Sequence, residues 1–214
     1  MSVRADFAHH HLRAAAVAAR RAYDIETAGE ANTLGPGFDE IMTCVPVSVC
    51  MAGAALEANA NELIQDILDW KVRTTVMTDA HKVLLEELLE NRSGNALDRY
   101  RMVALLRDRV LDRRDSAWGE AALLIAFRNF FMHFKPNWEP TDSEPKKLAA
   151  KFAKKFTLAE PYKTNAFYMF PHACLTYECA KWSVQTVLNF SQFMSKSLGI
   201  ADRLSGWQPA SPLP

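Results

Sequence analysis

Apolar residues recur along this chain at steps of three and four positions, and this spacing constrains the fold more than any other feature. It is the spacing that gives an α-helix one face to bury. We find no convincing run of alternating polar and apolar residues, the pattern that indicates a β-strand. The chain has 214 residues, 49% of them hydrophobic, which is enough for one sizeable core. We therefore predict an all-α protein, a bundle of about five to seven helices.

Helix-breaking and helix-capping residues divide this pattern into segments. A Gly-Pro-Gly stretch at Gly35–Gly37 ends the first helix, and Pro46 precedes the second. Asp115 or Ser116 caps a later helix, and Gly199 ends the last one as a C-cap. The expected helices cover about residues 5–30, 47–70, 79–90, 100–110, 115–134, 146–156 and 171–199.

Two of these segments differ from an ordinary amphipathic helix. The segment from Ala121 to Phe134 is apolar almost all round, so we expect it at the centre of the bundle. The segment around Tyr100 is densely charged, which is typical of a solvated face with ion pairs along the helix. Its charged residues are Asp98, Arg99, Arg101, Arg107, Asp108 and Arg109.

The chain shows no repeat of fixed period and no linker long enough to separate two domains. We expect one helical domain over residues 1–199, with its core over about residues 45–195. The remaining residues, 200–214, are predicted to form a flexible tail.

Charge and hydrophobicity narrow the class of protein. Lys plus Arg and Asp plus Glu number 25 each, so no overall positive charge favours nucleic acid, and contact with RNA requires a local basic patch. The first residues lack the pattern of a signal peptide. The longest unbroken apolar stretch, Ala121 to Phe127, is far shorter than the roughly 20 residues of a membrane span. We expect a soluble, cytoplasmic protein without membrane contact.

Neither the cysteines nor the histidine run predicts a metal site. Cys44, Cys50, Cys174 and Cys179 lie in apolar segments without C-x-x-C spacing, so we expect buried thiols. His9–His11 are adjacent on a helix and therefore point to different sides. The chain also contains no P-loop and no G-x-G-x-x-G motif. We expect neither a metal nor another cofactor.

The segment Arg128-Asn129-Phe130-Phe131-Met132-His133 is the strongest functional signal in the chain. It places a permanent cation, an amide and an imidazole at the end of a strongly apolar helix. Arginine binds phosphate through its planar fork, and imidazole exchanges protons near neutral pH. Attack of a ribose 2′-OH on the neighbouring phosphate requires a base, an acid and a cation for the phosphoryl oxygens. The segment offers the cation and one of the proton-transfer groups that this reaction requires.

The surrounding sequence, AFRNFFMHFKP at Ala126–Pro136, resembles the motif of the HEPN superfamily (higher eukaryotes and prokaryotes nucleotide-binding domains). In that motif an Arg, a polar residue, a short spacer and a His stand near the end of a core helix. The acidic and amide-rich segment Leu56–Leu63 adds to the resemblance, which covers about residues 45–195. HEPN proteins are helical bundles and usually dimers, and many are metal-independent ribonucleases that act as toxins or defence effectors. The resemblance implies these properties here, together with an antitoxin or regulatory partner.

A dimer also answers a geometric problem of the motif. On an ideal helix, Arg128 and His133 are separated by about 140° of rotation, and Asn129 and His133 by about 40°. A two-fold interface brings two copies of each residue to one axis, so that one imidazole is the base and the other the acid. In this hypothesis Arg128 grips the scissile phosphate, His133 transfers protons, and Asn129 orients His133 or donates to the phosphate.

Other interpretations of the same residues remain open at this point. His133 is also what a helix C-terminus favours through its dipole, and Arg128 fits a side chain that extends along the bundle edge to solvent. An inactive HEPN-like module that only binds a protein partner would carry the same sequence. Glu57 and Asn61, four residues apart on one helix, either lie beside the motif and hold Arg128, or are exposed.

Lysines after the motif supply a candidate surface for RNA. In the HEPN subset controlled by nucleotidylation a Tyr stands two residues after the His, and this chain has Lys135 there, so we do not expect that control. A local basic patch would contact the RNA backbone, whereas the alternative is the solvated face of an amphipathic helix. The lysines predicted to bind RNA are Lys135, Lys146, Lys147 and Lys151.

Overall fold

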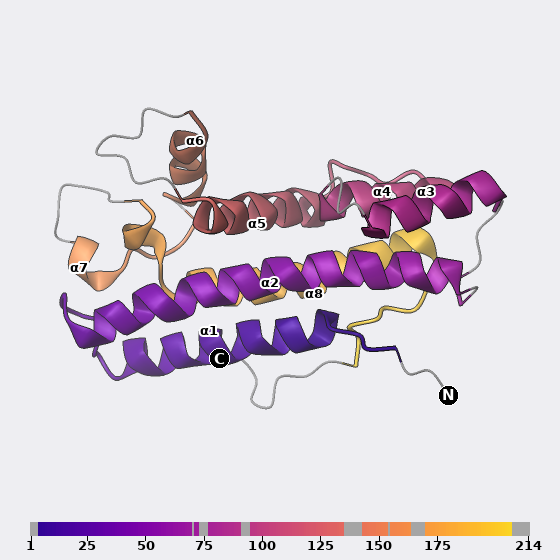
Figure 1. The fold of residues 1–214 in the computed structure, drawn as a ribbon. Coiled ribbons are helices and arrows are strands. Elements are labelled where there is room, and N and C mark those ends of the chain that lie inside the picture. The colour runs from indigo at the N-terminus through magenta and orange to yellow at the C-terminus, as the bar shows by residue number, and fades with distance from the viewer. Residues whose placement is uncertain are drawn as a thin grey trace.

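The structure is a computed structural model that describes residues 4–69, 71–72, 77–90, 95–134, 143–153, 155–163 and 170–206. Within these ranges the chain forms eight α-helices, one short 3₁₀ helix and no strand, which confirms the all-α prediction (Figure 1). The helices are α1 (Ala8–Thr27), α2 (Pro36–Leu68), α3 (Asp79–Glu90), α4 (Ala96–Leu106), α5 (Ser116–Met132), α6 (Ser143–Phe152), α7 (Glu160–Lys163) and α8 (Tyr177–Leu198), with the 3₁₀ helix at His172–Cys174.

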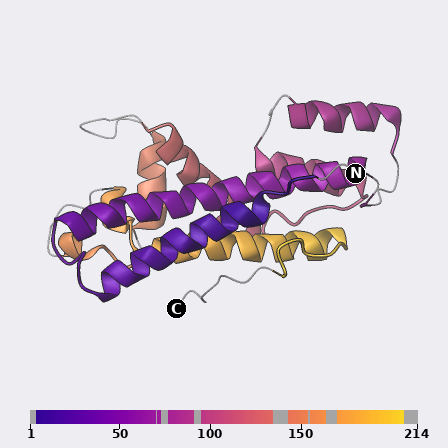
Figure 2. The same ribbon diagram turned by 60° about the horizontal axis from the view of Figure 1, so that its bottom comes forward.

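Helix α2 is the central element of the bundle. Its 33 residues span about 50 Å, and it contacts α1, α4, α5 and α8. Figures 1 and 2 show α1, α2 and α8 running side by side, with α4 and α5 following one another along α2. A stripe of small residues on α1 allows its close packing on α2 and α8. These residues are Ala15, Ala19 and Ala22, all fully buried.

Helix α5 does not occupy the centre that its sequence predicted. It buries Ala121, Leu124 and Phe127 but exposes Ala122 and Ala126, so it packs on the bundle through one face only. Alanine is apolar yet small, and its exposure costs little. The apolar composition of α5 therefore led to a prediction of more burial than the structure shows.

The second helix begins eleven residues earlier than predicted, at Pro36. Pro36 stands in its first turn, where proline needs no hydrogen-bond partner, and Pro46 lies inside the helix. An internal proline removes one backbone hydrogen bond and disfavours a helix. The fully buried Val45 and Val49 on either side of Pro46 show that packing holds the helix together there.

Several other helix ends differ from the expected ones by local geometry. Helix α4 ends at Leu106, and Val110, expected on its apolar face, is 94% exposed. The last helix begins at Tyr177, after the separate 3₁₀ turn. Asp115 accepts a hydrogen bond from the backbone of Ala117, which confirms the predicted cap of α5.

The core extends beyond the predicted residues at both ends. Leu12 and Ile25 of α1 are fully buried, and Leu204 after α8 is 3% exposed. The Arg203 guanidinium pairs with Glu62 at 3.0 Å. The described part of the predicted tail, residues 200–206, is therefore packed on the bundle through Arg203 and Leu204. Residues 207–214 lie outside the described ranges.

An ion-pair cluster holds both ends of the described chain at the end of α2. We call it the Asp66 clasp. The side chain of Asp66 is 9% exposed. Its carboxylate forms an ion pair with the Arg4 guanidinium at 2.8 Å and a second ion pair with Arg203. Arg4 additionally contacts Asp69 at 3.2 Å. The clasp thus joins the segment before α1, the last turn of α2 and the turn after α8.

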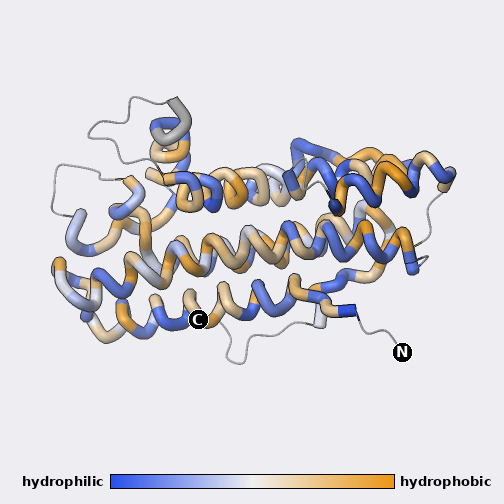
Figure 3. The backbone as a smooth tube through the Cα atoms, in the orientation of Figure 1, coloured by the Kyte–Doolittle hydropathy of each residue, from blue (hydrophilic) through white to orange (hydrophobic). Residues whose placement is uncertain are grey.

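Helix α2 is long and apolar enough to cross a membrane by length and composition. Polar residues such as Thr43 and Ser48 interrupt its apolar sequence, so this helix contains no long unbroken apolar stretch. The central helix of a globular bundle meets the same criteria, and α2 is packed by five other helices, α1, α3, α4, α5 and α8. Figure 3 shows polar and apolar residues interspersed along the helices of the bundle.

The cysteines are free thiols with different degrees of burial. Cys174 and Cys179 are buried as predicted, whereas Cys44 and Cys50 are half-buried. Burial raises the pKa of the Cys179 thiol well above its ordinary value.

Candidate functional site

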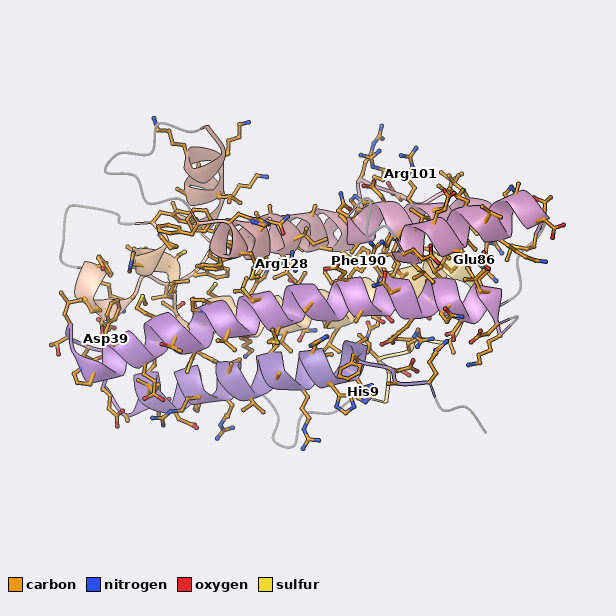
Figure 4. All side chains as sticks on the ribbon, viewed as in Figure 1. His9, Asp39, Glu86, Arg101, Arg128 and Phe190 are labelled. Atoms are coloured by element: carbon orange, nitrogen blue, oxygen red, sulfur yellow. The ribbon has the colours of Figure 1, made fainter. Side chains whose placement is uncertain are left out.

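A small cavity of about 250 Å³ lies between α2, α4 and α5, around Arg128. Figure 4 shows Arg128 on the side of α5 that faces α2. The side chain is 28% exposed, so its guanidinium is sheltered but accessible to solvent. The cavity is lined by Gly53, Glu57, Asn95, Ala96, Ile125, Arg128 and Asn129.

Gly53 on α2 makes room for the Arg128 side chain. A Cβ atom at position 53 would lie 2.9 Å from Cγ of Arg128 and 3.1 Å from its Cβ, closer than carbon atoms pack. Residues Ala52–Ala55 form a small-residue run, which is the one sequence signal for this close approach. Gly53 was not among the residues predicted from the sequence.

Two polar side chains contact the Arg128 guanidinium. Its Nη1 donates to Oδ1 of Asn129 at 3.0 Å, and its Nη2 lies 3.6 Å from Oε2 of Glu57. Of the residues predicted from sequence, the structure therefore brings Arg128, Asn129 and Glu57 together. Asn129 was expected beside His133, and in the structure its amide oxygen faces Arg128.

Asn61 accepts a hydrogen bond from a different arginine, Arg99 of α4. Nη1 of Arg99 donates to Oδ1 of Asn61 and lies 3.9 Å from Oε1 of Glu57. The Arg99 side chain is 2% exposed, so its predicted place on a solvated helix face was wrong. The pattern of charges along α4 cannot distinguish a buried arginine from its exposed neighbours, because burial depends on which face α2 covers.

A buried hydrogen-bond chain fixes α4 against α2 next to these arginines. The Asn59 amide donates to the Tyr100 hydroxyl at 2.8 Å, and that hydroxyl donates to the backbone oxygen of Leu56 at 3.2 Å. Burial raises the pKa of Tyr100 well above its usual range, so the hydroxyl stays neutral. Arg99 and Tyr100 are adjacent, and this chain therefore sets the position of Arg99 as well.

His133 lies outside the cavity, at the exposed C-cap of α5. Its backbone N–H donates to the oxygen of Asn129 at 3.0 Å, one turn earlier. No contact joins its imidazole to Arg128 in the portion of the chain that the structure describes. A single chain therefore places the arginine and the imidazole about one helical turn apart, on different parts of the surface.

Three of the predicted RNA-binding lysines lie on α6, which is anchored beside the end of α5. The rings of Phe152 and Phe127 are 4.4 Å apart between centroids, and both side chains are fully buried. The opposite face of α6 is exposed and carries Lys146, Lys147 and Lys151. Lys135 lies outside the described residues.

The half-buried thiol of Cys50 lies within the electrostatic influence of Arg128. Burial raises the Cys50 pKa, and the positive charge of Arg128 opposes part of that increase. Among the residues whose positions are described, no group of three or more His, Cys, Asp and Glu side chains gathers where it could hold a metal ion. The chemistry of the cavity is that of guanidinium, amide and carboxylate groups.

Comparisons with known proteins identify no family. No family model matches the chain, no curated protein matches it, and no solved structure matches it. The resemblance to HEPN proteins therefore rests on the residues of the motif alone.

Proposed function

We propose that this protein is a metal-independent endoribonuclease of the HEPN type that acts in the cytoplasm in a toxin–antitoxin or defence system. The observation that carries the proposal is the cavity beside α5, where the Arg128 guanidinium is held by Asn129 and Glu57. His133 lies exposed one turn beyond Asn129 on the same helix. Arginine and histidine are the groups that bind a phosphodiester and move protons.

The proposed reaction is an internal transfer at phosphorus. The ribose 2′-oxygen bonds to the adjacent phosphorus as its proton passes to one His133, and the bond from phosphorus to the 5′-oxygen breaks. A second His133 gives a proton to that leaving oxygen. Arg128 stabilises the charge on the phosphoryl oxygens. The products are a 2′,3′-cyclic phosphate and a 5′-OH end, and no water, metal or redox cofactor is consumed.

A homodimer supplies the second imidazole. His133 is exposed, and so are its neighbours Met132 at 57% and Phe134 at 55%. Large apolar side chains gathered at one exposed helix end support burial in an interface. A two-fold interface there would bring together both copies of α5 and of the lysine-bearing α6.

A second candidate function is a non-catalytic HEPN-like binding module that acts through a protein partner, such as an antitoxin or a regulatory protein. The same exposed Met132 and Phe134 favour it, because an apolar helix end serves a different partner equally well. The ion pair between Glu57 and Arg128 also favours it, since a paired arginine is a weaker phosphate ligand. The two candidates differ in one measurable property, the cleavage of RNA.

The deciding experiment incubates the purified protein with single-stranded RNA in the presence of EDTA. We expect cleavage with 2′,3′-cyclic phosphate and 5′-OH ends, and losses on the order of 100-fold or more in both Arg128→Ala and His133→Ala. Arg113→Ala, which removes an exposed arginine between α4 and α5, is the matched control and should keep full activity.

Three results would reject the ribonuclease. They are full activity in His133→Ala, cleavage that EDTA abolishes, and a solution mass that corresponds to a strict monomer. If the wild-type protein does not cleave RNA but binds a protein partner, the second candidate, the non-catalytic binding module, is favoured.

A further inference from the structure

Arg99 has more hydrogen-bonding capacity than the residues around it use. Its side chain is 2% exposed. Nη1 donates to Asn61, but Nε and Nη2 are buried without a hydrogen-bond partner among the described residues. A buried guanidinium without a full set of acceptors is costly, and native proteins rarely keep one without a reason. Within the described residues, Arg99 therefore has two donor nitrogens, with three N–H groups between them, that lack an acceptor next to the candidate site.

The Glu57 carboxylate stands between Arg99 and Arg128. One oxygen lies 3.9 Å from Nη1 of Arg99, and the other lies 3.6 Å from Nη2 of Arg128. Both distances exceed the usual 2.7–3.2 Å of a hydrogen bond, so the carboxylate is attracted by both arginines and bound tightly by neither. The Glu57 side chain is 41% exposed, which leaves it room to change rotamer.

These three groups together carry one net positive charge, and two of them, Glu57 and Arg128, line the cavity. Two guanidinium groups share one carboxylate, so Glu57 cannot neutralise Arg128 completely. A phosphodiester that enters the cavity would compete with Glu57 for Arg128. The outcome depends on where the displaced carboxylate can go.

We propose that Glu57 is a displaceable counter-ion, and that Arg99 receives it when a phosphodiester of RNA binds Arg128. The inference rests on the proposed function, because it takes Arg128 as the phosphate ligand. The incoming phosphate accepts hydrogen bonds from the Arg128 guanidinium, and the Glu57 carboxylate moves toward Nε and Nη2 of Arg99. Charge-assisted hydrogen bonds form at both arginines as a result. Arg99 is thus a positioning residue that acts on the substrate through Glu57.

The mechanism predicts a specific dependence between two substitutions. In Arg99→Met the carboxylate has only Arg128 to pair with, so phosphate binding must break a complete ion pair. In Glu57→Gln the competing charge is absent and Arg128 is free. Once Glu57 has been replaced, the loss of Arg99 should matter little, because Arg99 acts through that carboxylate.

The experiment measures binding of a labelled all-2′-deoxy oligonucleotide, which keeps the phosphodiesters but lacks the attacking hydroxyl. Affinity is followed by fluorescence anisotropy at one fixed salt concentration, since salt alone changes such affinities. We expect Glu57→Gln to bind about tenfold more tightly and Arg99→Met about tenfold more weakly than wild type. In the Glu57→Gln background, Arg99→Met should change affinity by less than about twofold.

Arg101→Met is the matched control, since Arg101 is an exposed arginine of the same helix that Figure 4 shows on the side of α4 away from α2. It removes one positive charge without touching Glu57, and its effect should be small and equal in both backgrounds. An Arg99→Met loss of equal size in both backgrounds would show a direct charge effect and overturn the proposal. No loss in either background would also overturn it.

Two further readouts keep the result interpretable. Thermal unfolding of each variant reports whether Arg99→Met is folded. If Arg99→Met is unfolded, the binding of Glu57→Gln decides the question. Unchanged or weaker oligonucleotide binding by Glu57→Gln would contradict a displaceable counter-ion. Cleavage of ordinary RNA separates this inference from the proposed function. If the Arg99 and Glu57 substitutions are coupled in binding but RNA is not cleaved, the ribonuclease is rejected and the counter-ion role of Glu57 stands. If RNA is cleaved but the two substitutions are independent, the ribonuclease stands and the counter-ion role is rejected.

Discussion

At the scale of single residues, Gly53 determines where the Arg128 side chain lies. The glycine hydrogen faces Cγ of Arg128, and any larger side chain would occupy the same space. Position 53 lies inside α2, where alanine favours a helix more than glycine does. Helix stability therefore favours alanine at position 53, whereas the position of the Arg128 side chain requires glycine.

We expect Gly53→Ala to reduce RNA cleavage while changing stability little. The new methyl group displaces Arg128, and misplacing a substrate-binding group by about 1 Å costs on the order of 100-fold in rate. The gain in helix propensity, about 1 kcal/mol, offsets the strain in the free energy of unfolding. Steady-state cleavage assays and urea unfolding measure the two effects. Unchanged cleavage in Gly53→Ala would mean that the position of Arg128 does not matter to the reaction.

Arg99 and Arg128 also show how far single residues can be interpreted from sequence. The Arg128 to His133 spacing pointed to one short segment, and the structure places a cavity beside it. Arg99 was assigned to a solvated face because its neighbours Asp98 and Arg101 are charged. Its burial follows from the contact of α4 with α2, a tertiary contact that no local pattern encodes.

At the scale of the helices, the ends set by local chemistry were predicted and those set by packing were not. Gly199 ends α8 with a φ of 64°, in the left-handed region that glycine adopts easily, and Asp115 caps α5. Pro46 was taken as a boundary because proline disfavours helices, but contacts with α1 and α8 carry α2 through it. Local signals thus located caps, whereas continuity depended on neighbours far away in sequence.

Gly199→Ala should destabilise the protein by about 1 kcal/mol, the cost of a left-handed backbone for a residue with a Cβ atom. No other atom lies within 4 Å of the added carbon, so the effect would be one of backbone strain alone. Gly119→Ala is the control with the opposite sign. Its added carbon also meets open space, inside helix α5, and should stabilise by about 0.5–1 kcal/mol. Chemical denaturation of both variants checks the pair, and equal signs would contradict this account of the α8 cap.

At the scale of the whole molecule, the Asp66 clasp joins parts of the chain that are remote in sequence. Arg4 and Arg203 approach one carboxylate at the end of the central helix. The predicted domain placed the core at about residues 45–195 and a flexible tail after residue 199. The clasp and Leu204 account for the difference, because ion pairs between remote segments leave no periodic signal in the sequence.

Asp66→Asn should lower the free energy of unfolding by about 3 kcal/mol, because it removes the more buried of the two carboxylates, Asp66 and Asp6, that both arginines share. Asp69→Asn is the matched control. Asp69 is 35% exposed and contacts Arg4 at 3.2 Å, and a pair of that exposure contributes less than about 1 kcal/mol. Thermal and urea unfolding of both variants measure the difference. Equal losses would show that the Asp66 clasp is no stronger than a surface ion pair.

The clasp also has a practical consequence for studying the molecule. Because Arg4 and Arg203 meet at Asp66, the two ends of the described chain emerge together, at the pole opposite the carboxyl end of α5 and helix α6 (Figure 1). A protein attached to a sensor chip through a residue near either arginine would present α6 and the His133 end of α5 to the flowing solution, free for nucleic acid or a second subunit to dock.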